Sequence, residues 1–346
     1  MTTLHSRIGF EVELLAPRGS SRRTLAEELA TRSGGELLPV WHLDSEPVPL
    51  ESLGGRFLHL THGFEVRRAG GEQLCTLVDD ITIAADLDPT APAADGWHRL
   101  LTDDIRLARL LDRQCDPAAG IEAVLDPVAR LWGTPVETIG HIRRLDVAGA
   151  TVVLAAPAGG ERERPCEIVT PPLTADHGDA LEELLAPARE LGFVVPREAA
   201  IHLHVDGAPY RNPAALANVV RLFGYWREPL RELLGTNPQC RRLAPLPDEL
   251  VAAVAGEPTY DELRAAAKAG GLTKFYDVNL TQLFRDDPIR DTLEIRILPG
   301  AISAEDVVSR AAVVEELLQR CLDPAPIARP RENPPPSPTF LVSPGP

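Results

Sequence analysis

The stretch Ile8–Leu15, I-G-F-E-V-E-L-L, constrains the fold more than any other part of the chain. A short run of β-branched and aromatic residues behind a glycine predicts a strand. Because side chains alternate along a strand, Glu11 and Glu13 lie on one face, roughly 7 Å apart, and the apolar residues lie on the other. Two carboxylates this close repel each other. On a solvated strand, which is the ordinary case for glutamate, water screens this repulsion. Beside an apolar core a divalent cation neutralises it instead, because Mg²⁺ prefers carboxylate oxygen.

Three later stretches repeat this alternation: C-E-I-V-T-P-P-L at Cys166–Leu173, I-H-L-H-V-D at Ile201–Asp206 and T-L-E-I-R-I-L at Thr292–Leu298. Each has an ordinary interpretation: a strand with one solvent-exposed face, two structural histidines, or an ion pair without a role in catalysis. Four apolar strands that each carry a metal-type ligand nevertheless favour one shared site. The candidate residues on their polar faces are Glu167, His202, His204, Asp206, Glu294 and Arg296.

These motifs resemble those of the amidoligase family, a group of carboxylate–amine ligases related to glutamine synthetase and glutamate–cysteine ligase. G-F-E-V-E, C-E-I-V-T-P-P-L, I-H-L-H-V-D, K-F-Y-D-V-N-L and T-L-E-I-R-I-L-P-G occur in the family's order, across residues 8–320. The resemblance implies an α+β fold. It further implies a curved, mainly antiparallel sheet like that of the glutamine synthetase catalytic domain, with helices packed on its outer face.

The same resemblance implies a ligase that uses ATP to join a carboxylate to an amine through an acyl phosphate. Its substrates would be small molecules or peptides, and its cofactor two or three Mg²⁺ ions, with Mn²⁺ as an alternative. Glu13 and Glu167 would share one metal, where acid and amine meet. Glu11, His202 and Glu294 would hold another against the ATP phosphates.

The remaining site residues also follow from the resemblance. Arg296 would stabilise the transferred phosphoryl group and, with Glu13, is an expected catalytic residue. Lys274 and Asn279 are candidates for contact with the nucleotide or substrate. His204 would support His202 or touch the substrate. Asp80, in a sequence that keeps an acid and a hydroxyl but lacks the family's glycine, is either a substrate contact or a turn residue.

Composition excludes several classes of function. A net charge of −16 argues against a nucleic-acid partner, and no apolar run is long enough to cross a membrane. The five cysteines are scattered, without a C-x-x-C pair, which indicates a cytoplasmic protein rather than a disulfide framework or zinc site. No Walker A sequence and no helix-opening G-x-G-x-x-G is present, which argues against P-loop and Rossmann nucleotide sites.

Three other functions stay open at this point. The His202/His204 pair resembles the motif of metal-dependent hydrolases, although there it normally ends the first barrel strand. A phosphotransferase related to guanidino kinases would share the ligase fold. A catalytically inactive binding protein is the third, and the joint presence of Glu11, Glu13, Glu167, His202, Glu294 and Arg296 argues against it.

The domain organisation is predicted to be one catalytic domain at 1–322 and a proline-rich disordered tail at 323–346. Residues 87–150 are an expected insertion, with helices at Asp103–Gln114 and Ile121–Trp132 and a hairpin or a long strand at Arg143–Ala156. Further strands are expected at Leu74–Ala84, bent or paired, and at Lys274–Leu283. Asn212–Leu234 is expected to be a helix, kinked at Pro229.

Overall fold

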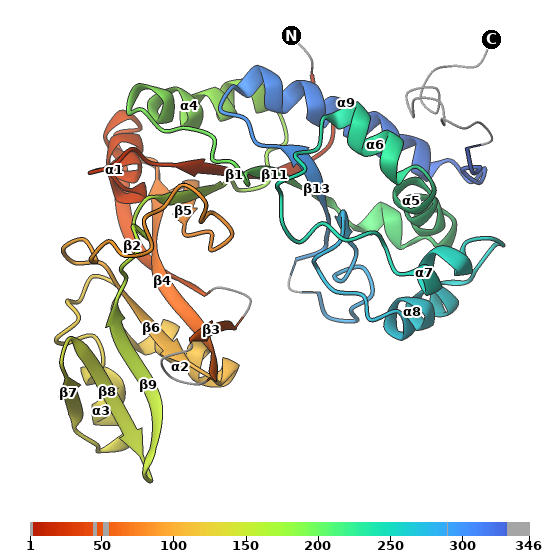
Figure 1. Ribbon diagram of the computed structural model, residues 1–346. Helices are drawn as coiled ribbons and strands as arrows, with labels where there is room; N and C mark the ends of the chain where they lie inside the picture. Colours follow the sequence, from red (N-terminus) through yellow and green to blue (C-terminus); the bar gives the residue numbers. More distant parts are fainter. Residues whose placement is uncertain (1–2, 44–46, 51–54, 289, 331–346) are drawn as a thin grey trace. The chain divides into compact units, whose positions relative to one another are not determined.

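The computed structural model describes residues 3–43, 47–50, 55–288 and 290–330 (Figure 1). The chain divides into two units. The first contains the residues up to Glu13, then Thr170–Ala186, and the residues from Arg197 on; the second contains Leu14–Val169 and Pro187–Pro196. Both units combine helices with antiparallel, unclosed sheet, as the α+β prediction requires. The single catalytic domain at 1–322 stays a prediction.

The sheet of the first unit has the strand order β12-β13-β11-β1. Its strands are β1 (Ile8–Leu15, in this unit as far as Glu13), β11 (Ala200–Asp206), β12 (Val278–Asn279) and β13 (Thr292–Pro299). All neighbours are antiparallel, and Glu11 lies opposite His202 while His204 lies opposite Glu294. The apolar face of β1 is fully buried, with Phe10 and Leu14 both 0% exposed.

The helices of the first unit follow its strands. They are α4 (His177–Glu190, whose last turn belongs to the second unit), the 3₁₀ turn η2 (Ala208–Arg211), α5 (Pro213–Tyr225), α6 (Arg227–Leu234), α7 (Asp248–Ala253), α8 (Tyr260–Ala269) and α9 (Ala304–Leu322). The helix α5 packs against α7, α8 and α9 (Figure 1). In the described part of the chain, no helix has the length and apolar character needed to cross a membrane.

The predicted helix Asn212–Leu234 is two helices, and the break is not at Pro229. Asn212 caps α5 and Pro213 opens it, as expected. The chain then leaves helical geometry at Trp226, with φ −109° and ψ 18°. Pro229 lies in the first turn of α6, where backbone N–H groups have no partner within the helix, so its missing N–H costs nothing there.

Part of the predicted tail is packed. Asn218 on α5 donates from Nδ2 to the carbonyl oxygens of Asp323 at 2.8 Å and Ala325 at 3.2 Å, and it accepts from the Ile327 N–H. Ile327 is 1% exposed. The packed chain therefore extends eight residues into the predicted tail, to 330, and residues 331–346 lie outside the described part.

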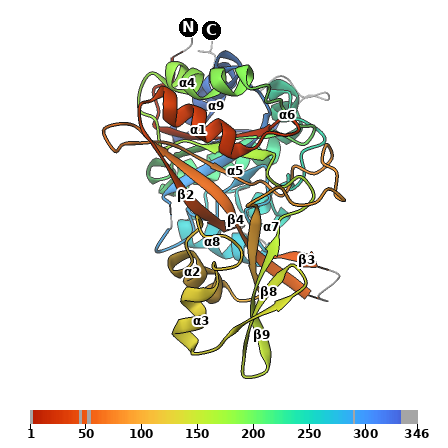
Figure 2. The same cartoon turned by 90° about the vertical axis from the view of Figure 1, so that its left-hand side faces the viewer.

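The sheet of the second unit has the strand order β10-β5-β4-β6-β9-β8-β7, with β2 and β3 also paired to β4. Its strands are β2 (Glu36–Leu43), β3 (Val48–Leu50), β4 (Gly55–Arg67), β5 (Gln73–Val78), β6 (His98–Thr102), β7 (Val136–Ile139), β8 (Ile142–Val147), β9 (Ala150–Pro157) and β10 (Pro165–Val169). The helix α1 (Arg22–Arg32), capped by Ser21, packs on β2 and β4 (Figure 2).

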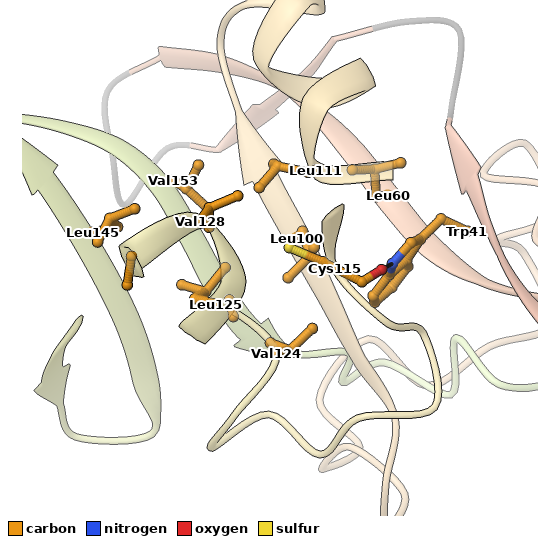
Figure 3. Close-up of a cluster of buried hydrophobic side chains, with 12 residues drawn as sticks. Trp41, Leu60, Leu100, Leu111, Cys115, Val124, Leu125, Val128, Leu145 and Val153 are labelled. Atoms are coloured by element: carbon orange, nitrogen blue, oxygen red, sulfur yellow. Dashed lines mark hydrogen bonds between the residues drawn. The ribbon is translucent and has the colours of Figure 1, made fainter. Parts of the chain in front are cut away.

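The expected insertion at 87–150 contributes to the core of this unit. It supplies α2 (Ile105–Gln114), α3 (Asp126–Trp132) and the β8–β9 hairpin with Gly149 in its turn. Figure 3 shows side chains of α2, α3 and the β-strands gathered into one buried cluster, including Leu100, Leu111, Val128, Leu145 and Val153. Residues 121–125 form turns, so α3 begins later than predicted.

Two predicted strands are shorter than expected. In Leu74–Ala84, β5 ends at Val78, because Asp80 accepts hydrogen bonds from the N–H and hydroxyl of Thr82 and forms a turn. In Lys274–Leu283 only Val278–Asn279 is strand. The Asn279 side chain ends it in the same way by accepting from Thr281.

Candidate metal-binding and active site

One face of the first unit's sheet gathers the predicted acidic and imidazole side chains. The residues Glu11 and Glu13 of β1 alternate with buried apolar residues and therefore point to the same side. The antiparallel register places Glu11 opposite His202 of β11, and places His204 opposite Glu294 of β13. The pairing of β11 with β13 shifts between Ile201 and Leu203, so the strand is irregular at His202.

His202 lies among three carboxylates. Its Nδ1 is 3.1 Å from an oxygen of Glu11 and 3.6 Å from one of Glu294, and its Nε2 is 3.5 Å from Glu13. Glu13 is 4% exposed and also accepts a hydrogen bond from the Ala200 N–H at 2.8 Å. These contacts place Glu13 deeper in the sheet than Glu11.

His204 occupies the outer part of the same face. Its Nε2 is 3.0 Å from Glu11, and its Nδ1 is 3.4 Å from the hydroxyl of Thr292. Arg290, whose side chain is 63% exposed, brings a guanidinium nitrogen 3.8 Å from the same carboxylate of Glu11. Arg290 was not among the predicted residues, because it lies outside the alternating motif, in the loop before β13.

Glu294 is held by two neighbours. The Asn279 amide donates to it at 2.7 Å, and the Arg296 guanidinium donates to its other oxygen. Nε of Arg296 is buried and has no hydrogen-bond partner among the described residues. One guanidinium nitrogen of Arg296 is thus fixed by Glu294, and Nε remains available as a donor.

Burial and charge compete in this cluster. Burial opposes ionisation of Glu11, but the charge of His204 and hydrogen bonds from both histidines hold its pKa well below the usual value. Burial likewise opposes ionisation of Glu294, and Arg296 lowers its pKa nevertheless. Burial disfavours the charged form of His204, yet Glu11 raises the pKa of its imidazole. The carboxylates therefore stay ionised, as ligands of a cation must be.

The donor set suits a divalent cation. One ligand atom each from Glu11, His204 and Glu294 lie within 4.8 Å of one another. Carboxylate oxygens suit Mg²⁺ or Mn²⁺, and one imidazole is compatible with Mn²⁺. His204 was predicted as a supporting or substrate residue, so this grouping adds it to the candidate ligands. The roles predicted for His202 and Glu13 as ligands stay predictions.

The predicted residues Glu167 and Asp80 belong to the second unit. Glu167 is on β10 of the second unit, opposite Val78 of β5, and its role as a ligand stays a prediction. Asp80, in the same unit, uses its carboxylate to form the turn with Thr82, which supports the alternative of a turn residue. Lys274, in the first unit, places its ammonium 5.2 Å from the centre of the Phe275 ring.

Comparison with known proteins gives one match. The family model described as "putative amidoligase enzyme" matches residues 4–318. No curated protein and no solved structure matches the chain. The matched range contains all the motifs from G-F-E-V-E to T-L-E-I-R-I-L-P-G, and with them every residue of the cluster described above.

Proposed function

Because the chain belongs to the amidoligase family, we propose that it joins a carboxylate to an amine at the expense of ATP. The family indicates an enzyme of ligase type. ATP as the energy source, Mg²⁺ as the cofactor and the acyl phosphate as the intermediate are the parts that we add. They are supported by the ionised acids, imidazoles and arginine on one face of the first unit.

The chemistry needs such a face. A carboxylate oxygen of the substrate attacks the γ-phosphorus of ATP, and ADP leaves with the electrons of the broken P–O bond. The amine then attacks the acyl carbon, phosphate leaves, and the amine loses a proton. Both reactants of the first step are anionic, so fixed positive charge must offset their repulsion.

Different residues of the cluster would bind the cation and stabilise the transferred phosphoryl group. Glu11, His204 and Glu294 would hold a divalent cation, with Glu13 and His202 as the predicted further ligands. When bound, the cation would neutralise phosphate oxygens. Arg296 would donate from its unpartnered Nε to the transferred phosphoryl group, while Glu294 holds the other end of the guanidinium. Asn279 keeps Glu294 in place by its 2.7 Å hydrogen bond.

The observation that carries the proposal is the convergence of Glu11, Glu13 and Glu294 within 3.6 Å of His202, on strands distant in sequence. The test is an incubation with ATP, Mg²⁺, hydroxylamine and a pool of amino acids and short peptides. ADP and a hydroxamate are expected together. Hydrolysis of amides or esters without ADP would favour the hydrolase instead, and a phosphorylated guanidino compound would favour the phosphotransferase.

Variants tie the activity to the cluster. Glu13→Ala and Arg296→Ala are each expected to abolish formation of ADP and hydroxamate. Glu122→Gln is the matched control, because the Glu122 side chain is 77% exposed and pairs with Arg143 in the second unit. If either cluster variant keeps full activity, the role given to that residue is wrong.

A further inference from the structure

The sheet of the second unit has a second polar face. In the register of β10, β5 and β4, Ile168, Leu77 and Phe64 lie opposite one another and are buried. Glu167 precedes Ile168 and Val78 follows Leu77, and the two lie opposite each other in the register. Because side chains alternate along a strand, Glu167 and Val78 point to the face opposite that of Ile168 and Leu77. The odd-numbered residues of β4, including His59 and Thr61, alternate onto this same side. We call it the Glu167 face.

Arg99 of β6 belongs to the Glu167 face as well. In the antiparallel pairing of β4 with β6, His59 lies opposite Leu101 and Leu60 opposite Leu100. The next position of this register places Thr61 opposite Arg99. Arg99 and His59 are also close enough for the Arg99 charge to affect the imidazole.

These three residues have unused hydrogen-bonding groups. Nε2 of His59, the hydroxyl of Thr61 and Nε of Arg99 are buried and have no hydrogen-bond partner among the described residues. The residues His59 and Thr61 are only 2% and 6% exposed. A buried polar group without a partner is costly, so three on adjacent positions call for a ligand that satisfies them together.

The charge of this group is positive. Asp79, the acid that affects both His59 and Arg99, is already held by Arg162 in an ion pair and a second hydrogen bond. Burial, with Arg99 next, lowers the pKa of His59 to about 4, so its imidazole is neutral at pH 7 and has one N–H to donate. The set is therefore one guanidinium, one hydroxyl and one neutral imidazole.

We propose that Arg99, Thr61 and His59 form an oxyanion site on the Glu167 face. A carboxylate or a phosphate offers several acceptor oxygens to these donors and matches the charge of Arg99. The identity of the occupant rests on the proposed ligase function: it is an anionic group of a ligase substrate, and this group does not itself react. An amino acid or peptide with a second carboxylate would have such a group, and so would a phosphorylated substrate.

The test measures binding without ATP or turnover. Glutarate and inorganic phosphate are titrated separately into protein labelled with ¹³C at the histidine ring, at constant ionic strength, and the His59 signal is assigned with His59→Gln. A saturable shift is expected with at least one of the two anions. Glutarate alone would identify a carboxylate group as the occupant, and phosphate alone a phosphoryl group.

Variants show whether the three residues act as a site. Arg99→Gln is expected to weaken binding by about 10–100-fold, and Thr61→Val by a smaller factor. The control Arg144→Gln removes a half-exposed arginine from β8 of the same unit and should bind as the wild type does. The proposal is overturned if neither anion gives a saturable shift, or if a folded Arg99→Gln protein binds with wild-type affinity.

The two proposals fail separately. Anion binding without formation of ADP and hydroxamate would keep the site and remove the ligase. Ligase activity without anion binding would do the reverse. When a ligase substrate is found, Arg99→Gln should raise the KM for the acid and leave the KM for ATP unchanged if the occupant is a carboxylate.

Discussion

At the scale of single residues, Glu294 connects the proposed cation site of the first unit with the guanidinium of Arg296. One of its oxygens faces the Asn279 amide and the other faces Arg296, and His202 lies 3.6 Å away. A carboxylate held in this way has little rotational freedom left to lose when it binds a cation. Neighbours that orient a ligand in this way are the usual reason why a site prefers one geometry.

The first residue-scale prediction concerns metal binding. Glu294→Gln keeps the shape of the side chain and removes its charge, so it should weaken Mn²⁺ binding by about 10–100-fold or more. Asn279→Ala should weaken it less, because the carboxylate remains. Electron paramagnetic resonance of free Mn²⁺ measures both without any substrate. Equal affinity in Glu294→Gln, Glu122→Gln and the wild type would remove Glu294 from the proposed ligands.

Sequence patterns predicted which side chains share a face but not which atoms meet. The spacing of Glu11 and Glu13, and of His202 and His204, follows from the two-residue period of a strand. That Glu11 contacts both His202 and His204 depends on side-chain conformations and on the assembled sheet, whose pairing is irregular at His202. Arg290 depends on the path of a loop. Neither feature has a local signal in the sequence.

At the scale of elements, β4 carries a buried aromatic group on its core face. His62 stacks on Trp41 of β2 at 5.0 Å between ring centres and lies 4.5 Å from His98 of β6. The ring nitrogens of His62 have no hydrogen-bond partner among the described residues. Burial, and then the nearby His98, lowers the pKa of His62 to about 3, and burial also lowers the pKa of His98.

The element-scale prediction is acid sensitivity of the second unit. A histidine of an unfolded chain has a pKa of about 6.5, so between about pH 6.5 and 3 the unfolded state binds more protons than the folded one. The stability that neutral His62 contributes is complete above pH 6.5 and falls as the pH drops. At pH 4.5 the loss should be about 2–3 kcal/mol for this residue.

Urea unfolding of variants between pH 4.5 and 7 checks this. His62→Phe should flatten the dependence of the unfolding free energy on pH. His141→Gln, which changes an exposed histidine in the turn between β7 and β8, should leave the slope as it is. An unchanged slope in His62→Phe would contradict the assignment of this acid sensitivity to His62.

Most elements were predictable because their signals are local. The strands β1, β11 and β13 and the helix α2 follow from alternation and from helical spacing, and their bounds agree with the predictions to within about two residues. The break between α5 and α6 was misplaced because a proline within the first turn of a helix is tolerated. The short β12 was overestimated because side-chain hydrogen bonds of Asn279 compete with the strand.

At the scale of the molecule, long-range contacts secure the chain segments of the first unit. The carboxylate of Glu315 on α9 accepts hydrogen bonds from the backbone N–H groups of His5 and Ser6, just before β1. Asn218 on α5 similarly fixes residues 321–327. The indole of Trp226 donates to the Ala328 carbonyl at 2.9 Å. These polar contacts hold the segment before β1 and the segment after α9 against the helices of the first unit.

The whole-molecule prediction concerns the segment after α9. Ile327→Ala should lower the unfolding free energy of the first unit by about 2–4 kcal/mol, because the side chain is fully buried. Ile105→Ala, at a position 43% exposed, is the matched control and should change it by less than about 1 kcal/mol. Fluorescence of Trp226 during urea unfolding follows the first unit. Equal stabilities of the two variants would show that the segment contributes little.

The division into two units was not predictable from the sequence. Two of its four boundaries fall inside elements, after Glu13 in β1 and before Pro187 in α4. A strand and a helix that continue across a boundary leave no linker of glycine, proline or serine to mark it. The antiparallel α+β class was instead implied by the resemblance that the motifs carry.

The pairing of β1 with β11 has a consequence for synthesis on the ribosome. His202 follows Glu11 by 191 residues, so at about 5–20 residues per second translation separates them by about 10–40 s. During that time nearly all of the second unit emerges and can fold, while β1 still lacks its neighbour β11. Until β11 has left the exit tunnel, the edge of β1 that pairs with it stays open to pairing with other chains.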